Sequence, residues 1–258
     1  RANIAAIAQC TNTTGNNWNP DVETGFTAGL WWIKDTVNAN QHQLVDSVRG
    51  GNLAIRSPDL GAETAYVAPA GNSVAWCWNA PDEWASTDAG VTAGTIASNG
   101  RRNVAAGFSI IEYTGNGTAG ATIGHALNRA PEFFIIKRYD TGNTQLYVYT
   151  EAVGNQSALF LNSNAGEVAD SNIYWNSTSP NDTVITLGTV ADTNGDGDDL
   201  ICYAWHSVPG FSFIGSYEGN GSIDGPFIYT GQSSAFVMIK PINLADSWAI
   251  FDSTRTPD

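Results

Sequence analysis

The stretch Leu30-Trp31-Trp32-Ile33-Lys34 has two further versions, Phe133-Phe134-Ile135-Ile136-Lys137 and Ala235-Phe236-Val237-Met238-Ile239-Lys240. Each is an apolar run closed by a lysine, and the lysines follow one another at an interval of 103 residues. The chain contains no other lysine. A repeat of about 100 residues has the size of a whole domain rather than of a solenoid unit. The spacing therefore predicts tandem domains.

Each lysine is followed by a polar loop and a second short apolar run, a pattern typical of a β-hairpin. The second runs are Leu44-Val45, Tyr147-Val148 and Ile250-Phe251. Asp46-Ser47-Val48-Arg49 then recurs as Asp252-Ser253-Thr254-Arg255, whereas the middle copy has Tyr149-Thr150-Glu151-Ala152. We expect the lysines to point outward at the strand ends, with Asp46 or Asp252 as partner across the hairpin.

A third repeated element alternates large and small residues. Val74-Ala75-Trp76-Cys77-Trp78 and Ile201-Cys202-Tyr203-Ala204-Trp205 place large side chains on one face of a strand and small ones on the other. The large side chains are suited to fill the space between two sheets. Cys10, Cys77 and Cys202 form neither a disulfide framework nor a metal motif, and we predict buried free thiols.

The middle repeat gives the clearest strand pattern. Phe108-Ser109-Ile110-Ile111 precedes a Gly-Asn-Gly turn and recurs as Phe211-Ser212-Phe213-Ile214, which predicts a strand in both places. Within residues 107–209 we expect seven strands, near 108–114, 120–126, 132–138, 145–151, 157–162, 183–188 and 200–206. Short strands with frequent turns predict an all-β fold of tandem antiparallel β-sandwich domains, which are jelly-roll-like.

These patterns divide the chain into three units. Residues 1–106 form a first β-sandwich unit whose segment 79–106 is a linker, and residues 107–209 form a second unit. Residues 210–258 are a partial third unit, and half a sandwich cannot bury its own core. Either the chain continues beyond Asp258, or this half unit packs on a neighbouring domain or subunit.

The formal net charge is −14, with a sequence pI of about 4.3. This balance argues against nucleic acid and against anionic membrane surfaces, which both require clusters of lysine and arginine. No apolar run approaches the roughly 18 residues of a membrane span. We therefore expect no nucleic-acid partner and no membrane partner.

One acidic loop carries metal-binding chemistry. Asp192, Asn194, Asp196 and Asp198 place oxygen donors at alternate positions, as in the first half of a calcium loop. The glutamate that would complete such a loop is absent, because Tyr203 stands at that position. Two readings stay open: a calcium site, which would be the only cofactor, or a plain acidic turn before the next strand.

Tryptophan suggests glycan binding, because aromatic faces stack on sugar rings. Six of the nine tryptophans fall on repeated strands, where a core position is the simpler interpretation. Trp18, Trp84 and Trp175 lie in loop-like contexts and are the candidate glycan contacts. Glu112, Glu132, Glu151 and Glu218 are scattered and form no evident glycosidase pair.

We predict no catalytic residues. His42, His125 and His206 lie in no metal or nucleophile motif, and each is interpreted as an ordinary hydrogen-bonded or exposed histidine. The sequence has no phosphate loop, dinucleotide fingerprint or Gly-x-Ser-x-Gly elbow.

Several motifs in combination resemble a repeated domain of tailed-phage virion proteins, found chiefly in marine phages in tail-fibre-like and other appendage proteins. The motifs are Trp32-Ile33-Lys34, the segment 40–50, the segment 74–78, Gly107-Phe108-Ser109-Ile110, the segment 113–117, and Gly124-His125 before Ala130-Pro131. The resemblance implies a β-sandwich and a structural role in the virion, and it brings no catalytic or metal residues. The first unit departs from it by lacking the stretch that usually precedes the Trp strand.

The expected function is therefore that of a structural virion protein, a tail-fibre or capsid-decorating appendage located on the particle. We expect a homo-oligomer that contacts other virion proteins. The alternative is a carbohydrate-binding module that recognises host-surface glycans, and a glycan-degrading enzyme is a third reading.

Overall fold

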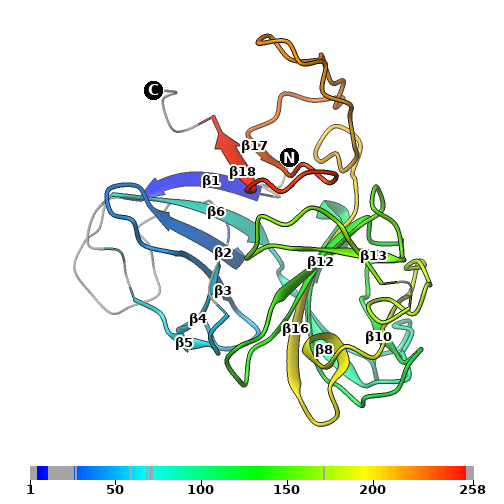
Figure 1. Ribbon diagram of the computed structural model, residues 1–258. Coiled ribbons are helices and arrows are strands. Elements are labelled where there is room, and N and C mark those ends of the chain that lie inside the picture. Colours follow the sequence, from blue (N-terminus) through cyan, green and yellow to red (C-terminus); the bar gives the residue numbers. More distant parts are fainter. Residues whose placement is uncertain are drawn as a thin grey trace.

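The computed structural model describes residues 26, 28–57, 60–67, 69, 72–170 and 172–253, together with the backbone of residues 5–10 (Figure 1). Trp18 lies outside the described residues. The structure is an all-β sandwich, as the sequence predicts, and all of its paired strands run antiparallel.

The first repeat forms a six-stranded sheet. Its strands follow the order β1-β6-β2-β3-β4-β5. Their bounds are β1 Ala5–Cys10, β2 Ala28–Asp35, β3 His42–Asp46, β4 Leu53–Ser57, β5 Thr64–Ala65 and β6 Ser73–Asn79. The predicted hairpin is β2–β3, and the Trp strand is β6, which lies in the middle of the sheet beside β2.

The second repeat builds its sheet in the same order. Its six corresponding strands are neighbours in the order β9-β16-β11-β12-β13-β14. Each strand of the first sheet therefore has a counterpart in the second. Their bounds are β9 Phe108–Thr114, β11 Phe133–Arg138, β12 Leu146–Thr150, β13 Ser157–Phe160, β14 Val168–Ala169 and β16 Asp199–Trp205. The seven strands predicted in this repeat are all present, and β14 is an additional one.

The predicted linker is wrong. Within residues 79–106, β7 (Asp82–Ala85) and β8 (Ser98–Asn103) extend the second sheet to eight strands, because β8 pairs along β9. The polar strand β8 packs closely against β9 at Gly100. A Cβ added at this glycine would lie only 1.8 Å from the carbonyl oxygen of Ile110 in β9. A short 3-10 helix, η1 (Val104–Ala106), then leads directly into β9.

The two sheets face each other across one core, which both repeats line. It contains Leu30, Trp32 and Trp76 from the first sheet, and Ile135 and Tyr203 from the second. The large residues of both Trp strands point into this core, as predicted, and the small ones face outward. The division into separate sandwiches at 1–106 and 107–209 is therefore corrected: each repeat supplies one sheet of a single sandwich.

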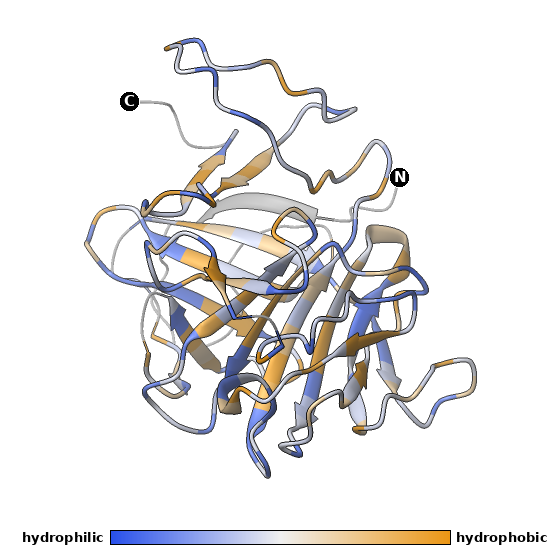
Figure 2. Ribbon diagram, turned by 45° about the vertical axis from the view of Figure 1, so that its right-hand side comes forward, coloured by the Kyte–Doolittle hydropathy of each residue, from blue (hydrophilic) through white to orange (hydrophobic). Residues whose placement is uncertain are grey.

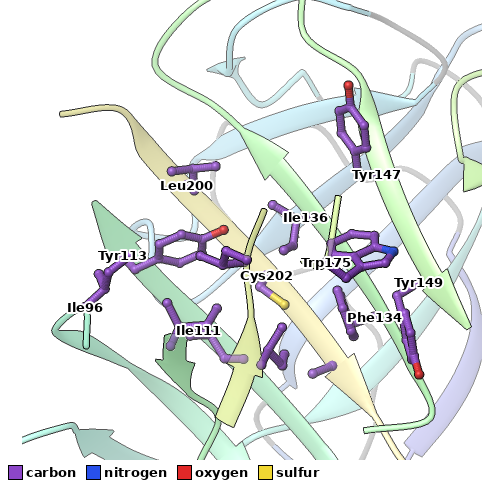
Figure 3. Close-up of a cluster of buried hydrophobic side chains, with 14 of the residues drawn as sticks. Ile96, Ile111, Tyr113, Phe134, Ile136, Tyr147, Tyr149, Trp175, Leu200 and Cys202 are labelled. Atoms are coloured by element: carbon purple, nitrogen blue, oxygen red, sulfur yellow. The ribbon is translucent and has the colours of Figure 1, made fainter. Parts of the chain in front are cut away.

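A second core lies on the outer face of the eight-stranded sheet (Figure 3). It is covered by the two-stranded sheet of β10 (Thr122–Gly124) and β15 (Val184–Thr186), and by the turn that contains Trp175. Cys202 is a buried free thiol there, and burial raises its pKa. Cys77 is buried on the outer face of the first sheet.

The third repeat is only partly folded into the sandwich. β17 (Phe236–Ile239) and β18 (Ala249–Asp252) form the predicted hairpin, with the same pairing register as β2–β3. The predicted strand at Phe211-Ser212-Phe213-Ile214 is wrong, because this segment makes only one isolated bridge, between Val208 and Ser212. The chain between that segment and β17 extends away from the sheets (Figure 1).

Candidate functional site

A buried polar network joins the two sheets. The carboxylate of Asp46, at the end of β3, is completely buried and accepts hydrogen bonds from the backbone of Val48 and Arg49. It also accepts 2.7 Å bonds from the Arg49 guanidinium and from the phenol of Tyr203 in the opposite sheet. Arg49 forms a second ion pair, at 2.8 Å, with Glu63. These four side chains are the inter-sheet network.

Tyrosines extend this network toward the surface. The Arg49 guanidinium lies 5.6 Å from the centre of the Tyr139 ring, and the Tyr139 phenol donates a 2.8 Å bond to Glu112. Burial raises the pKa of Tyr203 and of Tyr139, so both phenols remain donors. Burial alone lowers the pKa of Arg49, but Tyr203 and Asp46 more than offset this and raise it. The network is thus a set of matched donors and acceptors that holds the sheets together.

The lysines have different partners from those predicted. Lys34 donates a 2.6 Å bond to the carbonyl of Asn40, and Lys137 donates 2.7 Å bonds to the carbonyl and hydroxyl oxygens of Thr144. Lys240 donates to the carbonyl of Pro241 at 2.9 Å. The predicted pairing with Asp46 or Asp252 is wrong, because each lysine turns back onto loop carbonyls beyond its strand. Lys34 and Lys137 thus close their hairpin loops, whereas Lys240 bonds to its chain neighbour Pro241 and to Asn164 of the second repeat.

The acidic loop contains α1 (Ala191–Asn194) and contributes its side chains to the fold. Asp192 accepts a bond from the backbone N–H of Gln145, and Asp198 pairs with Arg138 at 2.6 Å. Asn194 is completely buried and bonds to backbone groups of neighbouring loops. Asp196 is exposed. In the part of the chain that the structure describes, no group of three or more His, Cys, Asp or Glu side chains is placed to hold a metal ion.

Two candidate glycan contacts belong to the core. Trp175 is 1% exposed, lies 4.9 Å from the Phe134 ring, and donates its N–H to the carbonyl of Ser157 (Figure 3). Trp84 is 3% exposed and packs in the same core from β7. The prediction that these two side chains present exposed faces to a sugar is wrong, because Trp84 is buried under the outer layer and Trp175 points from that layer into the core.

Acidic and histidine side chains also have structural partners. Glu112 accepts the Tyr139 phenol, and Glu132 accepts bonds from the backbone and hydroxyl of Ser207. His125 is completely buried, with one ring nitrogen 3.0 Å from the carbonyl of Asn181. The other ring nitrogen accepts the backbone N–H of Leu127, which makes the nitrogen facing Asn181 the protonated one. Burial lowers the pKa of His125 to about 4.

The third repeat is where apolar side chains reach solvent. One face of the β17–β18 hairpin covers the end of the shared core, where Phe236 lies 5.6 Å from the rings of both Trp76 and Trp78. Eight large apolar side chains of this repeat are exposed: Phe213, Tyr217, Ile223, Phe227, Ile228, Tyr229, Leu244 and Phe251. In Figure 2 the hairpin is apolar and stands beside the sheets, below a long loop. Contact with another molecule would remove these apolar side chains from water.

Comparison with known families gives one match, to a model described as a domain of unknown function, DUF7483, over residues 62–258. The chain belongs to the DUF7483 family. The match includes β6, the whole second sheet and the β17–β18 hairpin, but not β2 to β4. The DUF7483 unit is therefore longer than one repeat. No curated protein and no solved structure matches the chain.

A small pocket of mixed polar and apolar lining lies on the outer face of the first sheet of this DUF7483 chain. It has a volume of about 370 Å³ and is lined by the side chains of Asn40, Gln41 and Arg56, with Val67 and Pro69 as apolar walls. Gln43 fixes one side, because its amide exchanges two hydrogen bonds with the backbone of Val67. None of the helices in the described residues is long and apolar enough to cross a membrane.

Sequence reasoning identified some of these residues but not their arrangement. The repeated Asp46-Ser47-Val48-Arg49 motif marks half of the inter-sheet network, and its recurrence at 252–255 is the signal that could have singled it out. Glu63 and Tyr203 have no such signal, because their role depends on how the sheets face each other.

Proposed function

We propose that this DUF7483 chain is a structural protein of a bacteriophage particle, a tail-fibre or capsid-decorating appendage. Its motifs support the proposal, because in combination they resemble a repeated domain of tailed-phage virion proteins. The fold is compatible with such a role: repeats that share one core make a rigid body. Rigid β domains hold exposed loops away from a particle surface.

The observation that carries the proposal is the division of the third repeat. Phe236 is half-buried on the shared core, whereas Phe251 in the paired strand is 58% exposed and Phe227 is 91% exposed. Exposed apolar surface is one mark of a protein–protein contact, and an assembly protein buries it against its neighbours. The expected neighbours are copies of the chain or other virion proteins.

The inter-sheet network fits this role. Its ion pairs join Asp46, Arg49 and Glu63 within the first sheet, and the Tyr203 phenol, bonded to Asp46, links them to the second sheet. The acidic surface, with a net charge of −14, keeps such a domain from associating with nucleic acid.

The test is to locate the chain on particles. Phage particles purified from the source are analysed by mass spectrometry and cryo-EM, with an antibody against residues 72–253 as a label. We expect the chain at a fixed copy number and the antibody on a surface appendage. A chain that is abundant in lysates of infected cells and absent from purified particles would refute the proposal.

The second candidate function is recognition of host-surface glycans, and the pocket on the first sheet favours it. The amide of Gln41 and the guanidinium of Arg56 are donors that match sugar hydroxyl and carboxylate oxygens, and Asn40 beside them is fixed by a 2.7 Å bond from its amide to Asp35. On a glycan array, binding that Arg56→Gln reduces at least tenfold, and that Arg138→Gln on the other sheet leaves unchanged, would support this function. Absence of array binding would count against it.

A further inference from the structure

One arginine of this acidic chain has no partner. Of the six arginines that the structure describes, four form ion pairs with carboxylates, and Arg102 donates to the carbonyl of Ala126. The sixth, Arg56 in β4, has neither an ion pair nor a hydrogen bond to any described residue. Its partly buried side chain lines the pocket on the outer face of the first sheet. A guanidinium has five N–H donors, so Arg56 brings unused binding capacity to that pocket.

The fold does not require an arginine at this position, because the second repeat has an aromatic residue there. Gln43 and Arg56 are paired across β3 and β4, next to a residue pair that faces the shared core. Tyr147 and Phe160 are the corresponding pair across β12 and β13, also next to a core pair. Their rings pack 5.1 Å apart in the outer core. Packing of the sheet therefore does not explain Arg56.

Hydrogen bonds fix the walls of the pocket. On one side, Asn40 donates from its amide to Asp35 at 2.7 Å and accepts a 2.6 Å bond from Lys34 at its carbonyl. On the other side, the amide of Gln43 exchanges two bonds with the backbone of Val67. These bonds hold both walls without using the guanidinium. A site that is already formed loses less conformational freedom when a ligand binds.

The carboxylate that holds the first wall has no capacity left for Arg56. Asp35 accepts bonds from the backbone N–H groups of Val37 and Asn38 and from the side-chain amides of Asn38 and Asn40. Two of these bonds reach each oxygen, which fills the acceptor sites of the carboxylate. The bonds, those from Asn38 foremost, hold the pKa of Asp35 well below its usual range. A negatively charged ligand is therefore the partner that Arg56 can take.

The lining of the pocket narrows the class of ligand. Of the described side chains that line it, Arg56 alone is charged and none is aromatic. An amino acid would find no carboxylate for its ammonium group, and an aromatic acid would find no ring to stack on. A sugar acid has one carboxylate, hydroxyls for Gln41, and a C–H face for Val67 and Pro69. The volume of about 370 Å³ lies at the small end of ligand sites, which fits one sugar residue.

We propose that the pocket beside Arg56 binds a sugar acid, whose carboxylate takes two parallel hydrogen bonds from the guanidinium. The planar guanidinium matches the two oxygens of a carboxylate in spacing and direction. This inference rests on the second candidate function, glycan recognition, and names the class of glycan. A sulfated sugar brings the same charge in a tetrahedral group, and the experiment separates the two.

Matched sugars test the class of ligand. The probes are methyl glycosides in three pairs: glucuronic acid with glucose, galacturonic acid with galactose, and N-acetylneuraminic acid with its methyl ester. Methyl galactoside 6-sulfate is the sulfated probe. NMR titration of the folded chain measures each dissociation constant. We expect at least one acid to bind at least tenfold more tightly than its neutral counterpart and to shift the side-chain N–H signal of Arg56.

Three variants localise the site. Arg56→Phe introduces the residue type that the second repeat has at this place, and should abolish the preference for the acid. Arg56→Lys keeps the charge but loses the planar fork, and should weaken binding several-fold. It remains informative if the phenylalanine variant aggregates. Arg129→Gln removes an arginine outside the pocket, is the matched control, and should bind normally.

The outcomes separate this inference from the function on which it rests. Equal binding of acidic and neutral sugars would overturn the inference and leave glycan recognition standing. Tighter binding of the sulfated sugar would overturn the choice of a carboxylate. Acid binding that neither Arg56 variant weakens would overturn the site. If no sugar of the panel binds at concentrations up to about 20 mM, both the inference and glycan recognition by this pocket are refuted.

Discussion

The phenol of Tyr203 in β16 donates a 2.7 Å hydrogen bond to the carboxylate of Asp46 in β3, and so joins facing sheets through residues 157 positions apart. Tyr203→Phe leaves that buried carboxylate with one donor fewer, and should lower the free energy of unfolding by about 1–3 kcal/mol. Urea denaturation measures this. Tyr229→Phe is the control, because its side chain is 79% exposed. Equal effects of the two changes would show that the bond is unimportant.

Arg49→Met should have a larger effect than Tyr203→Phe. It removes the cation from a buried ion pair and leaves Asp46 uncompensated, which costs about 3–5 kcal/mol. Glu83→Gln breaks an ion pair of Arg101 in which the glutamate side chain is 80% exposed, and should cost less than about 1 kcal/mol. A loss for Arg49→Met as small as that for Glu83→Gln would contradict the role of the network.

The repeated lysines should contribute unequally. Lys137 is completely buried and satisfies two oxygens of Thr144, whereas the bond from Lys34 to Asn40 is exposed. Lys137→Met should lower the free energy of unfolding by about 1–3 kcal/mol, because the Thr144 carbonyl loses its donor. Lys34→Met should change it by less than about 0.5 kcal/mol. Thermal unfolding of both variants decides, and similar losses would refute the distinction.

Trp175 should behave as a core residue. Trp175→Ala opens a cavity beside Phe134 and should cost about 3–5 kcal/mol. Phe227→Ala removes a side chain that is 91% exposed and should cost almost nothing in the isolated chain. Chemical denaturation gives both values, and a Trp175→Ala variant of normal stability would contradict the described burial.

Stability should fall in mild acid because of His125. Its folded-state pKa of about 4 lies below the unfolded value of 6.5, so the unfolded chain takes up the proton first as the pH falls. The contribution is complete above about pH 6.5 and is lost progressively toward pH 4, up to about 3 kcal/mol. His125→Gln should flatten the difference in unfolding free energy between pH 7 and pH 5. An unchanged difference would exclude His125 as the cause.

The repeat made much of the fold predictable. The interval of 103 residues located the hairpins β2–β3, β11–β12 and β17–β18, and alternation in the Trp strands gave the face that each residue type occupies. Periodicity reports the local environment of a strand, and these strands have the same environment in both repeats.

The arrangement of the repeats was not predictable in the same way. Identical modules can each close a core of their own or share one, and their sequences are the same in either case. β8 was missed because Ser98–Asn103 is polar and is held by the edge of β9 rather than by its own side chains. Trp84 and Trp175 lie outside the repeated strands, and only the tertiary fold shows what covers them.

The shared core also determines the smallest piece of this chain that can exist as a folded body. A polypeptide that ended after β6 would expose Leu30, Trp32 and Trp76 to water, because the sheet that covers them is formed by the second repeat. One repeat therefore provides only one side of this core, and two repeats are the smallest unit in which both sides are present.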